Sequence, residues 1–171
     1  MKRLATLIIA SILIIIKPDY LLACSCSGES SVLDEMKYSN IVFNGVVISK
    51  TITTDLFKYG VNVVGNPNSS SYTAMLANTP VAVFKIRVLK IYKGKSSSDT
   101  ISIITAATGA SCGVPFQIGE KYIIYGTSGE SSMASNSFKR SSTNNKTYWT
   151  HRCSRTSYYS KDEDRAIKRL K

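Results

Sequence analysis

The chain has 171 residues, with 22 Lys and Arg against 11 Asp and Glu, and a formal net charge of +11. A chain of this length usually forms one domain with an adequate core. No apolar run reaches the length of about 20 residues that a membrane-spanning helix needs, so we expect no such helix. The basic charge favours anionic glycans, a cell surface or an acidic protein as partners. We expect no nucleic-acid partner, because the N-terminal pattern of the chain predicts export.

The first 23 residues have the order of a secretion signal. A charged start precedes the apolar run Leu4 to Ile16, and the small residue Ala23 stands directly before Cys24. We therefore expect residues 1–23 to be cleaved as a signal peptide and the mature protein to be secreted. The mature chain would begin with Cys24 and keep 19 Lys and Arg against 10 Asp and Glu, a formal charge of +9.

An alternative reading of the same segment is a lipid anchor. The residues Leu21 to Cys24 also resemble a lipobox, so Cys24 could attach the protein to the cell envelope. A thioether would then occupy its sulfur, and N-acylation would remove its amine. The polar interruption at Lys17 to Asp19 argues against this alternative, because the apolar run of a lipoprotein signal normally continues to the lipobox.

All four cysteines lie in the exported part of the chain: Cys24, Cys26, Cys112 and Cys153. An even number in an oxidising compartment favours two disulfides over a zinc site, and the close pair is CxC rather than the CxxC of zinc knuckles. A bond between Cys24 and Cys26 is disfavoured, since residues so close rarely meet disulfide geometry. The two other connectivities stay open, and both tie the N-terminus to distant parts of the chain.

The remaining pattern is mainly that of a small β-protein. A short helix is expected where Ser30 and Ser31 precede Val32 to Met36. Five segments rich in β-branched and aromatic residues predict strands, and five strands in series suggest a small barrel: Ile41 to Ile48, Val81 to Tyr92, Thr100 to Thr105, Lys121 to Gly126 and Lys146 to Arg152.

Two long polar insertions and a terminal helix complete the expected architecture. Loops are expected at about residues 50–80 and 127–147, longer than the connections of a compact domain usually are. In Lys161 to Lys171 the residues Ala166, Ile167 and Leu170 have helical spacing, which predicts a helix lying on the barrel. The acidic run Asp162 to Asp164 is explained by the helix dipole.

The sequence offers little for catalysis. The only histidine is His151, and no Gly-x-Ser-x-Gly elbow surrounds a serine. The acidic residues of the mature chain are few and scattered, which disfavours a metal site of the protein's own. We expect that the protein is not an enzyme and has no cofactor of its own.

Several motifs in order resemble one known family. They are Cys24-Ser25-Cys26, Val42-Phe43-Asn44-Gly45-Val46, Phe84-Lys85-Ile86-Arg87-Val88 with Tyr92-Lys93-Gly94, Cys112-Gly113, Gly119-Glu120-Lys121-Tyr122-Ile123-Ile124-Tyr125-Gly126 and Cys153-Ser154. Together they resemble the N-terminal, netrin-like domain of the tissue inhibitors of metalloproteinases, above all its compact single-domain relatives in microbes. The resemblance covers most of residues 24–171 as one domain.

The resemblance implies an OB-fold, a closed five-stranded barrel with a short N-terminal helix and a C-terminal helix. It also implies the disulfides Cys24 with Cys112 and Cys26 with Cys153. In this family the first residue, here Cys24, binds the catalytic zinc of a metzincin-type metalloendopeptidase through its main-chain amine and carbonyl. The implied protease contacts are Cys24, Ser25, Cys26, Ser27, Thr108, Gly109, Ala110 and Ser111.

The expected function is therefore that of a secreted, monomeric metalloprotease inhibitor for which zinc is only the metal of the bound protease. The alternative from a different class is an OB-fold module that binds anionic glycans while its cysteines are purely structural. Candidate residues for that basic face are Lys85, Arg87, Lys90 and Lys93.

Overall fold

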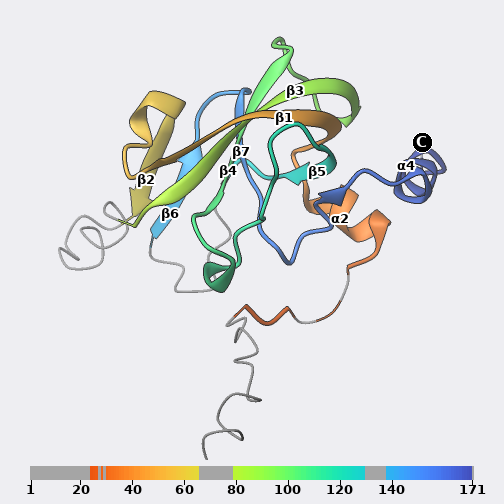
Figure 1. Ribbon diagram of the computed structural model, residues 1–171, viewed down its shortest axis with the longest axis horizontal. Helices are drawn as coiled ribbons and strands as arrows, with labels where there is room; N and C mark the ends of the chain where they lie inside the picture. The colour runs from red at the N-terminus through yellow and green to blue at the C-terminus, as the bar shows by residue number, and fades with distance from the viewer. Residues whose placement is uncertain (1–23, 27, 29, 66–78, 130–137, 171) are drawn as a thin grey trace, which may run out of the picture.

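The computed structural model describes residues 24–26, 28, 30–65, 79–129 and 138–170. The signal peptide expected at residues 1–23 lies outside them. The helices, turns and strands of the described structure, drawn in Figure 1, are α2 (Val32–Tyr38), β1 (Ile41–Thr53), η1 (Phe57–Tyr59), β2 (Val61–Gly65), β3 (Val81–Lys93), β4 (Thr100–Ala106), η2 (Gly109–Ser111), β5 (Lys121–Gly126), β6 (Phe138–Ser142), β7 (Thr147–Trp149), β8 (Ser157–Tyr158) and α4 (Lys161–Lys168).

A six-stranded sheet in the order β7-β4-β3-β1-β5-β8 forms the body of the molecule. The pair β4 and β7 is parallel, and every other pair is antiparallel. The central strand β1 shifts register against β3 at three places, and such irregularities bend a strand. Gly45 lies where β1 and β3 approach closely, because a Cβ there would come within 2.6 Å of the Arg87 carbonyl oxygen.

The mainly β class is confirmed, and all five predicted strands are present. The strand at Lys121 to Gly126 has the predicted bounds. The first strand continues to Thr53, into the segment expected to be a loop, and the last covers only Thr147–Trp149. Strand β8 was not predicted, because two residues carry no periodic pattern.

The prediction of a closed, five-stranded barrel is wrong in both the number of strands and the closure. The sheet has six strands and is open: among the residues that the structure describes, only the isolated bridge between Thr127 and Trp149 connects the end of β5 to β7. All three residues of β7 pair with β4, and of these Trp149 also pairs with Thr127. Strand β8 instead occupies the free edge of β5, beside Tyr122 and Ile123.

The two polar insertions pair with each other in their described parts. Strands β2 and β6 form an antiparallel two-stranded sheet from Val61 opposite Ser142 to Gly65 opposite Phe138. The Tyr59 carbonyl oxygen accepts hydrogen bonds from Asn144 Nδ2 at 2.9 Å and Thr147 Oγ1 at 2.8 Å, which fastens this sheet to the start of β7. Each of the two segments expected to be a loop therefore contains a strand.

The apolar core lies against the main sheet. Phe116, which follows η2, meets Phe84 and Tyr122 edge to face, at centroid distances of 5.0 and 4.8 Å. These rings pack with fully buried residues of β1, β3, β4 and β5, including Ile41, Phe43, Ile86, Ile101, Ile103 and Ile124. No helix among the described residues is long and apolar enough to cross a membrane.

The C-terminal helix α4 packs on the sheet through Ile167, which is fully buried beside Val42, Tyr92 and Tyr125. Leu170, predicted to share this face, is 44% exposed because α4 ends at Lys168. Figure 1 places α4 and α2 at the same end of the sheet, opposite β2 and β6.

The acidic run in α4 has specific partners, beyond the dipole effect inferred from the sequence. Asp164 is buried and accepts hydrogen bonds from the Tyr92 hydroxyl and from Lys168. Arg155 donates to both carboxylate oxygens of Glu163, at 2.9 and 2.6 Å. Burial alone would raise the pKa of Glu163, but the hydrogen bonds from Arg155 and Tyr125 outweigh it and hold that pKa below its ordinary value.

Candidate functional site

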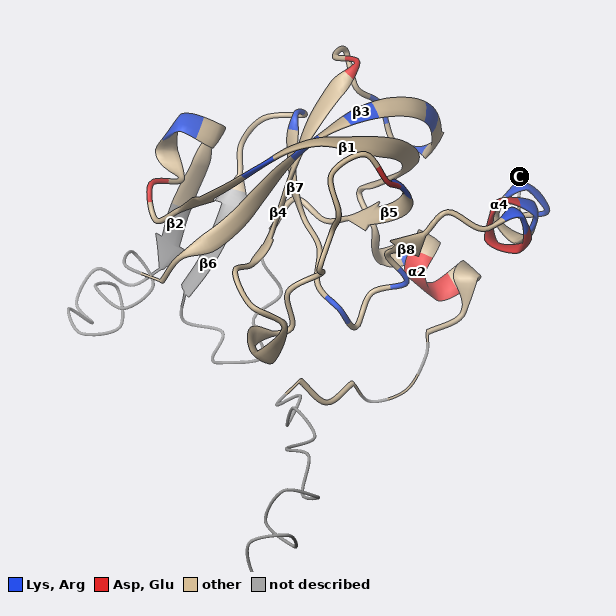
Figure 2. Ribbon diagram, in the orientation of Figure 1, with Lys and Arg blue, Asp and Glu red and all other residues tan. Residues whose placement is uncertain are grey.

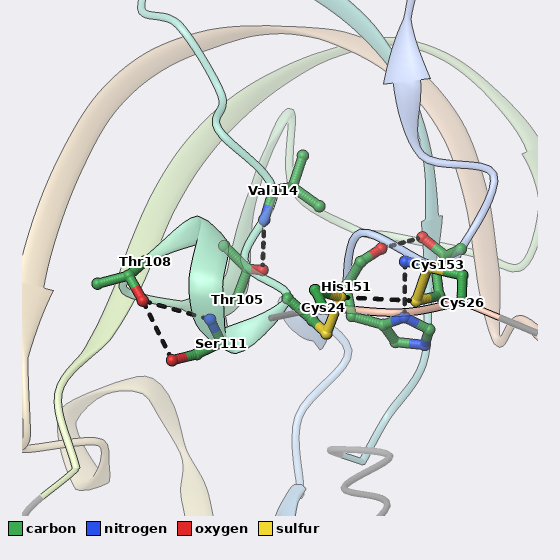
Figure 3. The surroundings of a disulfide bond; sticks show 10 residues. Cys24, Cys26, Thr105, Thr108, Ser111, Val114, His151 and Cys153 are labelled. Atoms are coloured by element: carbon green, nitrogen blue, oxygen red, sulfur yellow. Dashed lines mark hydrogen bonds between the residues drawn. A yellow bond between two sulfur atoms is a disulfide. The ribbon is translucent and has the colours of Figure 1, made fainter. Parts of the chain in front are cut away.

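Two disulfides fasten the N-terminal segment to the body of the protein. Cys24 is bonded to Cys112, with 5.1 Å between their Cα atoms, and Cys26 to Cys153, with 5.4 Å. This is the pairing that the resemblance implies. Figure 3 places the two bonds side by side, and Figure 1 places the segment at one edge of the molecule, next to η2.

The turn η2 holds the second predicted contact segment, Thr108 to Ser111, in one conformation. The Thr108 side chain caps the turn by accepting from the Ser111 N–H at 3.3 Å. Cys112 follows with a left-handed φ of 62°, which turns the chain sharply back. A Cβ on Gly113 would lie 2.2 Å from the Ala106 carbonyl oxygen, so only glycine fits the return into the core.

The connection between β7 and β8 carries Cys153, the second cysteine to which the N-terminal segment is bonded. The Arg152 N–H donates to the Cys112 carbonyl oxygen at 2.8 Å, so the two cysteine-bearing connections are bonded directly to each other. The Cys153 N–H donates to His151 Nδ1 at 3.1 Å, and Ser154 Oγ donates to the His151 carbonyl oxygen at 2.7 Å. The backbone around Cys112 and Cys153 is therefore held by hydrogen bonds as well as by disulfides.

The predicted contact residues come together at one edge. The Cys24–Cys112 bond brings Cys24 to the end of the segment Thr108 to Ser111. Within the two segments Cys24 and Gly109 are half-buried, whereas the other described members are exposed: Ser25, Cys26, Thr108, Ala110 and Ser111. Ser27 lies outside the described residues. An exposed edge with a rigid backbone can enter the cleft of another protein.

Sequence reasoning missed Arg152 as part of this edge. Its Nη1 atom lies 3.8 Å from the position that a Cβ on Gly109 would occupy. With Cys26, Gly28 and Ser30, residues 152–157 line a hollow of about 360 Å³. Among the described residues, the Arg152 guanidinium has no hydrogen-bond or ion-pair partner. Its position next to Cys153 is a signal that could have placed it beside the disulfides.

His151 was predicted to be structural, and in the described structure it braces the site. Burial lowers its pKa below the ordinary value of 6.5, and the nearby Glu35 carboxylate opposes this effect. The neutral imidazole accepts the Cys153 N–H, so its protonation at Nδ1 removes that hydrogen bond.

The stability of the protein is therefore expected to fall in mild acid. A folded-state pKa below the unfolded one gives a stability contribution that is complete above pH 6.5 and lost as the pH falls through the folded pKa. His151→Gln should cost about 0.5–1.5 kcal/mol at pH 7, as for one hydrogen bond, and should flatten the dependence between pH 5 and 7.

Urea unfolding of both proteins at pH 5, 6 and 7 measures this effect. The experiment is clean because His151 is the only histidine of the chain. Equal pH slopes for the wild type and His151→Gln would refute the role given to this side chain.

No protein-family model matches the chain, and no curated protein matches it. The geometry of the edge and the motifs that carry the family resemblance are therefore the grounds on which a function can be proposed.

Proposed function

We propose that the protein is a secreted inhibitor of a zinc metalloendopeptidase of the metzincin type. It would bind the protease's catalytic zinc through the main-chain amine and carbonyl oxygen of Cys24. One observation carries this proposal. Cys24 and Cys26 are bonded to two different connections of the fold, at Cys112 and Cys153, and Ser25 is exposed between them.

The chemistry of such an edge is straightforward. A catalytic zinc keeps one coordination position for water, and an amine with its neighbouring carbonyl oxygen can replace that water as a five-membered chelate. An α-amine has a reference pKa of about 7.7 to 8.0, so its deprotonation on binding costs little near neutral pH. Cleavage after Ala23 would create this amine at Cys24.

Rigidity of the edge would contribute to affinity. The two disulfides and the hydrogen bond from Arg152 to the Cys112 carbonyl oxygen order the segment before any partner binds. Less conformational entropy is then lost on association. Ser25 is small and uncharged, so it can enter a specificity pocket without burying a charge.

The strand order supports an OB-type barrel that is partly open. Five strands form this unit: β1, β3, β4, β5 and β7. Strand β1 pairs with β3 and with β5, β3 pairs with β4, and β4 pairs in parallel with β7. The bridge between Thr127 and Trp149 joins the end of β5 to β7. We infer that this five-stranded unit corresponds to the barrel of the resembled family.

The two alternatives receive less support. A lipid thioether on Cys24 would need the sulfur that is bonded to Cys112. In the basic face considered for glycans, Lys93 Nζ donates to the carbonyl oxygens of Met36 and Lys37 and so closes the end of α2. Figure 2 shows Lys and Arg spread along β3 and the neighbouring connections, while much of the Asp and Glu lies on α2 and α4.

An inhibition screen tests the proposal. The oxidised mature protein, beginning at Cys24, is assayed against a panel of metzincins with fluorogenic peptide substrates. Intact mass first establishes the start at Cys24, the loss of four hydrogens and the absence of lipid. A serine protease serves as the control. Salt-sensitive retention on an anionic glycan column without any inhibition would instead favour the glycan-binding module.

Ser25 should determine how well the edge fits the specificity pocket. Ser25→Arg places a long, charged side chain where a small one is expected, and burying an unpaired charge costs several kcal/mol. We expect inhibition to weaken by at least about 100-fold, equivalent to about 2.7 kcal/mol. Ser25→Ala is the matched control, with a change of less than about fivefold. Equal Ki values for the two variants would show that this side chain does not enter the pocket.

A further inference from the structure

The four cysteine sulfurs gather in one cluster that joins three separate parts of the chain. Cys24 Sγ lies 3.8 Å from Cys153 Sγ, although these two residues belong to different disulfides. The sulfurs of Cys24, Cys112 and Cys153 all lie within 4.8 Å of one another. Cys26 Sγ completes the cluster through its bond to Cys153. The two disulfides are thus neighbours in direct contact.

These separations suit a metal that prefers thiolates. Tetrahedral zinc with Zn–S bonds of about 2.3 Å holds its sulfurs about 3.8 Å apart. The contact between the two disulfides already has that spacing. On reduction, each bonded pair must separate from about 2 Å to this distance. Cys26 is exposed and has room to move, whereas the other three cysteines are half-buried.

The backbone that carries two of the ligands does not depend on the disulfides. The Cys112 N–H donates to the Gly109 carbonyl oxygen at 3.1 Å, and the Cys112 carbonyl oxygen accepts from the Arg152 N–H. Cys153 is braced by His151. A metal therefore has to capture only the short segment Cys24 to Cys26, which limits the ordering cost of binding.

The electrostatic surroundings also favour a thiolate cluster. Four thiolates around Zn²⁺ carry a net charge of −2, which neighbouring cations stabilise. Arg152 adjoins Cys153, and its guanidinium has no ion-pair partner among the residues that the structure describes. Glu163 is paired with Arg155, and the Glu35 carboxylate, which acts on His151, is an acid that opposes this effect.

We propose that the thiol form of the protein binds one Zn²⁺ through Cys24, Cys26, Cys112 and Cys153. Reduction of the two disulfides by four equivalents of a small-molecule thiol gives four protein thiols and two equivalents of its disulfide. Zinc binding then releases the four thiol protons. The metal takes over the cross-linking role of both disulfides. This site is independent of the proposed inhibition, in which zinc belongs to the partner.

Cobalt titration of the reduced mature protein tests this site, since Co²⁺ in a tetrathiolate site absorbs strongly in the visible range. The protein is reduced, freed of reductant without air, and titrated with Co²⁺ and then Zn²⁺. We expect one equivalent of Co²⁺ to bind and Zn²⁺ to displace it. Cys112→Ser and Cys153→Ser should each weaken binding by at least about tenfold, and Ile118→Ala, at an exposed position outside the cluster, should not. The oxidised wild type is the control that binds neither metal.

A second readout needs no variant. Zinc bound as proposed protects all four thiols of the wild type from alkylation, which intact mass measures directly. Protection of only two thiols, or Co²⁺ binding that is unchanged in Cys112→Ser, would mean that the Cys24 to Cys26 segment binds metal alone and would overturn the proposal. Neither readout depends on whether the oxidised protein inhibits a protease.

Discussion

A chain that retains Ala23 in front of Cys24 is expected to lose inhibition of its target metalloprotease while keeping its fold. The extra peptide bond converts the amine of Cys24 into an amide nitrogen, which has no lone pair available for zinc. The added residue also occupies the space next to the metal. A zinc interaction contributes several kcal/mol, and a loss of about 4 kcal/mol corresponds to a Ki that is roughly 1000-fold higher.

The comparison requires an extended protein that is otherwise unchanged. Both disulfides and the bond between the Arg152 N–H and the Cys112 carbonyl oxygen should persist, so the melting temperature should agree with that of the wild type. An alanine added after Lys171 is the matched control and should not affect Ki. Undiminished potency of the Ala23 form would eliminate chelation by Cys24 as the mechanism, even if the protein proved to be an inhibitor.

Replacing both Cys26 and Cys153 by serine is expected to cause the largest loss of stability. This disulfide spans a sequence separation of 127 residues. The chain-entropy treatment of such a loop gives about 5 kcal/mol of stabilisation. At about 2 to 4 °C per kcal/mol for a chain of this size, the melting temperature should fall by roughly 10 to 20 °C.

Calorimetry of the oxidised double variant measures this loss. The corresponding Cys24 and Cys112 double variant, with a separation of 88 residues, should lose a similar amount. The effects of the two bonds will not add, because their loops overlap. Ser25→Ala is a control for substitution in the exposed segment. A fall of less than about 3 °C for the Cys26 and Cys153 variant would show that hydrogen bonds alone fix the N-terminal segment.

Local pattern sufficed for most strands but not for the way the sheet ends. The β-branched and aromatic runs placed strands such as Lys121–Gly126, because those side chains pack well in a sheet, and five of the six residues of this strand are buried. The pairing of β2 with β6 left no such trace, since Phe138–Ser142 is mostly polar. The open edge depends on the two-residue strand β8, which is defined only by its contact with β5.

The candidate site was also predicted only in part from the sequence. The spacing of Cys24 and Cys26 after a signal-like segment marked the edge, but spacing alone left two disulfide connectivities open. The choice between them depended on the resemblance to a family. The bond from the Arg152 N–H to the Cys112 carbonyl oxygen could not be anticipated, because it joins two connections that are distant in the sequence. The bond from the Cys153 N–H to His151 is local, but no periodic pattern specifies the turn that forms it.

The bond between Arg155 and the Ser30 carbonyl oxygen, 2.8 Å long, has a consequence for the order of assembly. Together with the Cys26–Cys153 disulfide, it makes the segment from Cys24 to Ser30 depend on residues synthesised more than a hundred positions later. Contacts of such long sequence separation form late in folding. Nascent and truncated chains would therefore lack a finished edge, so that a protein proposed to restrain proteases would gain this capacity only once its own folding is complete.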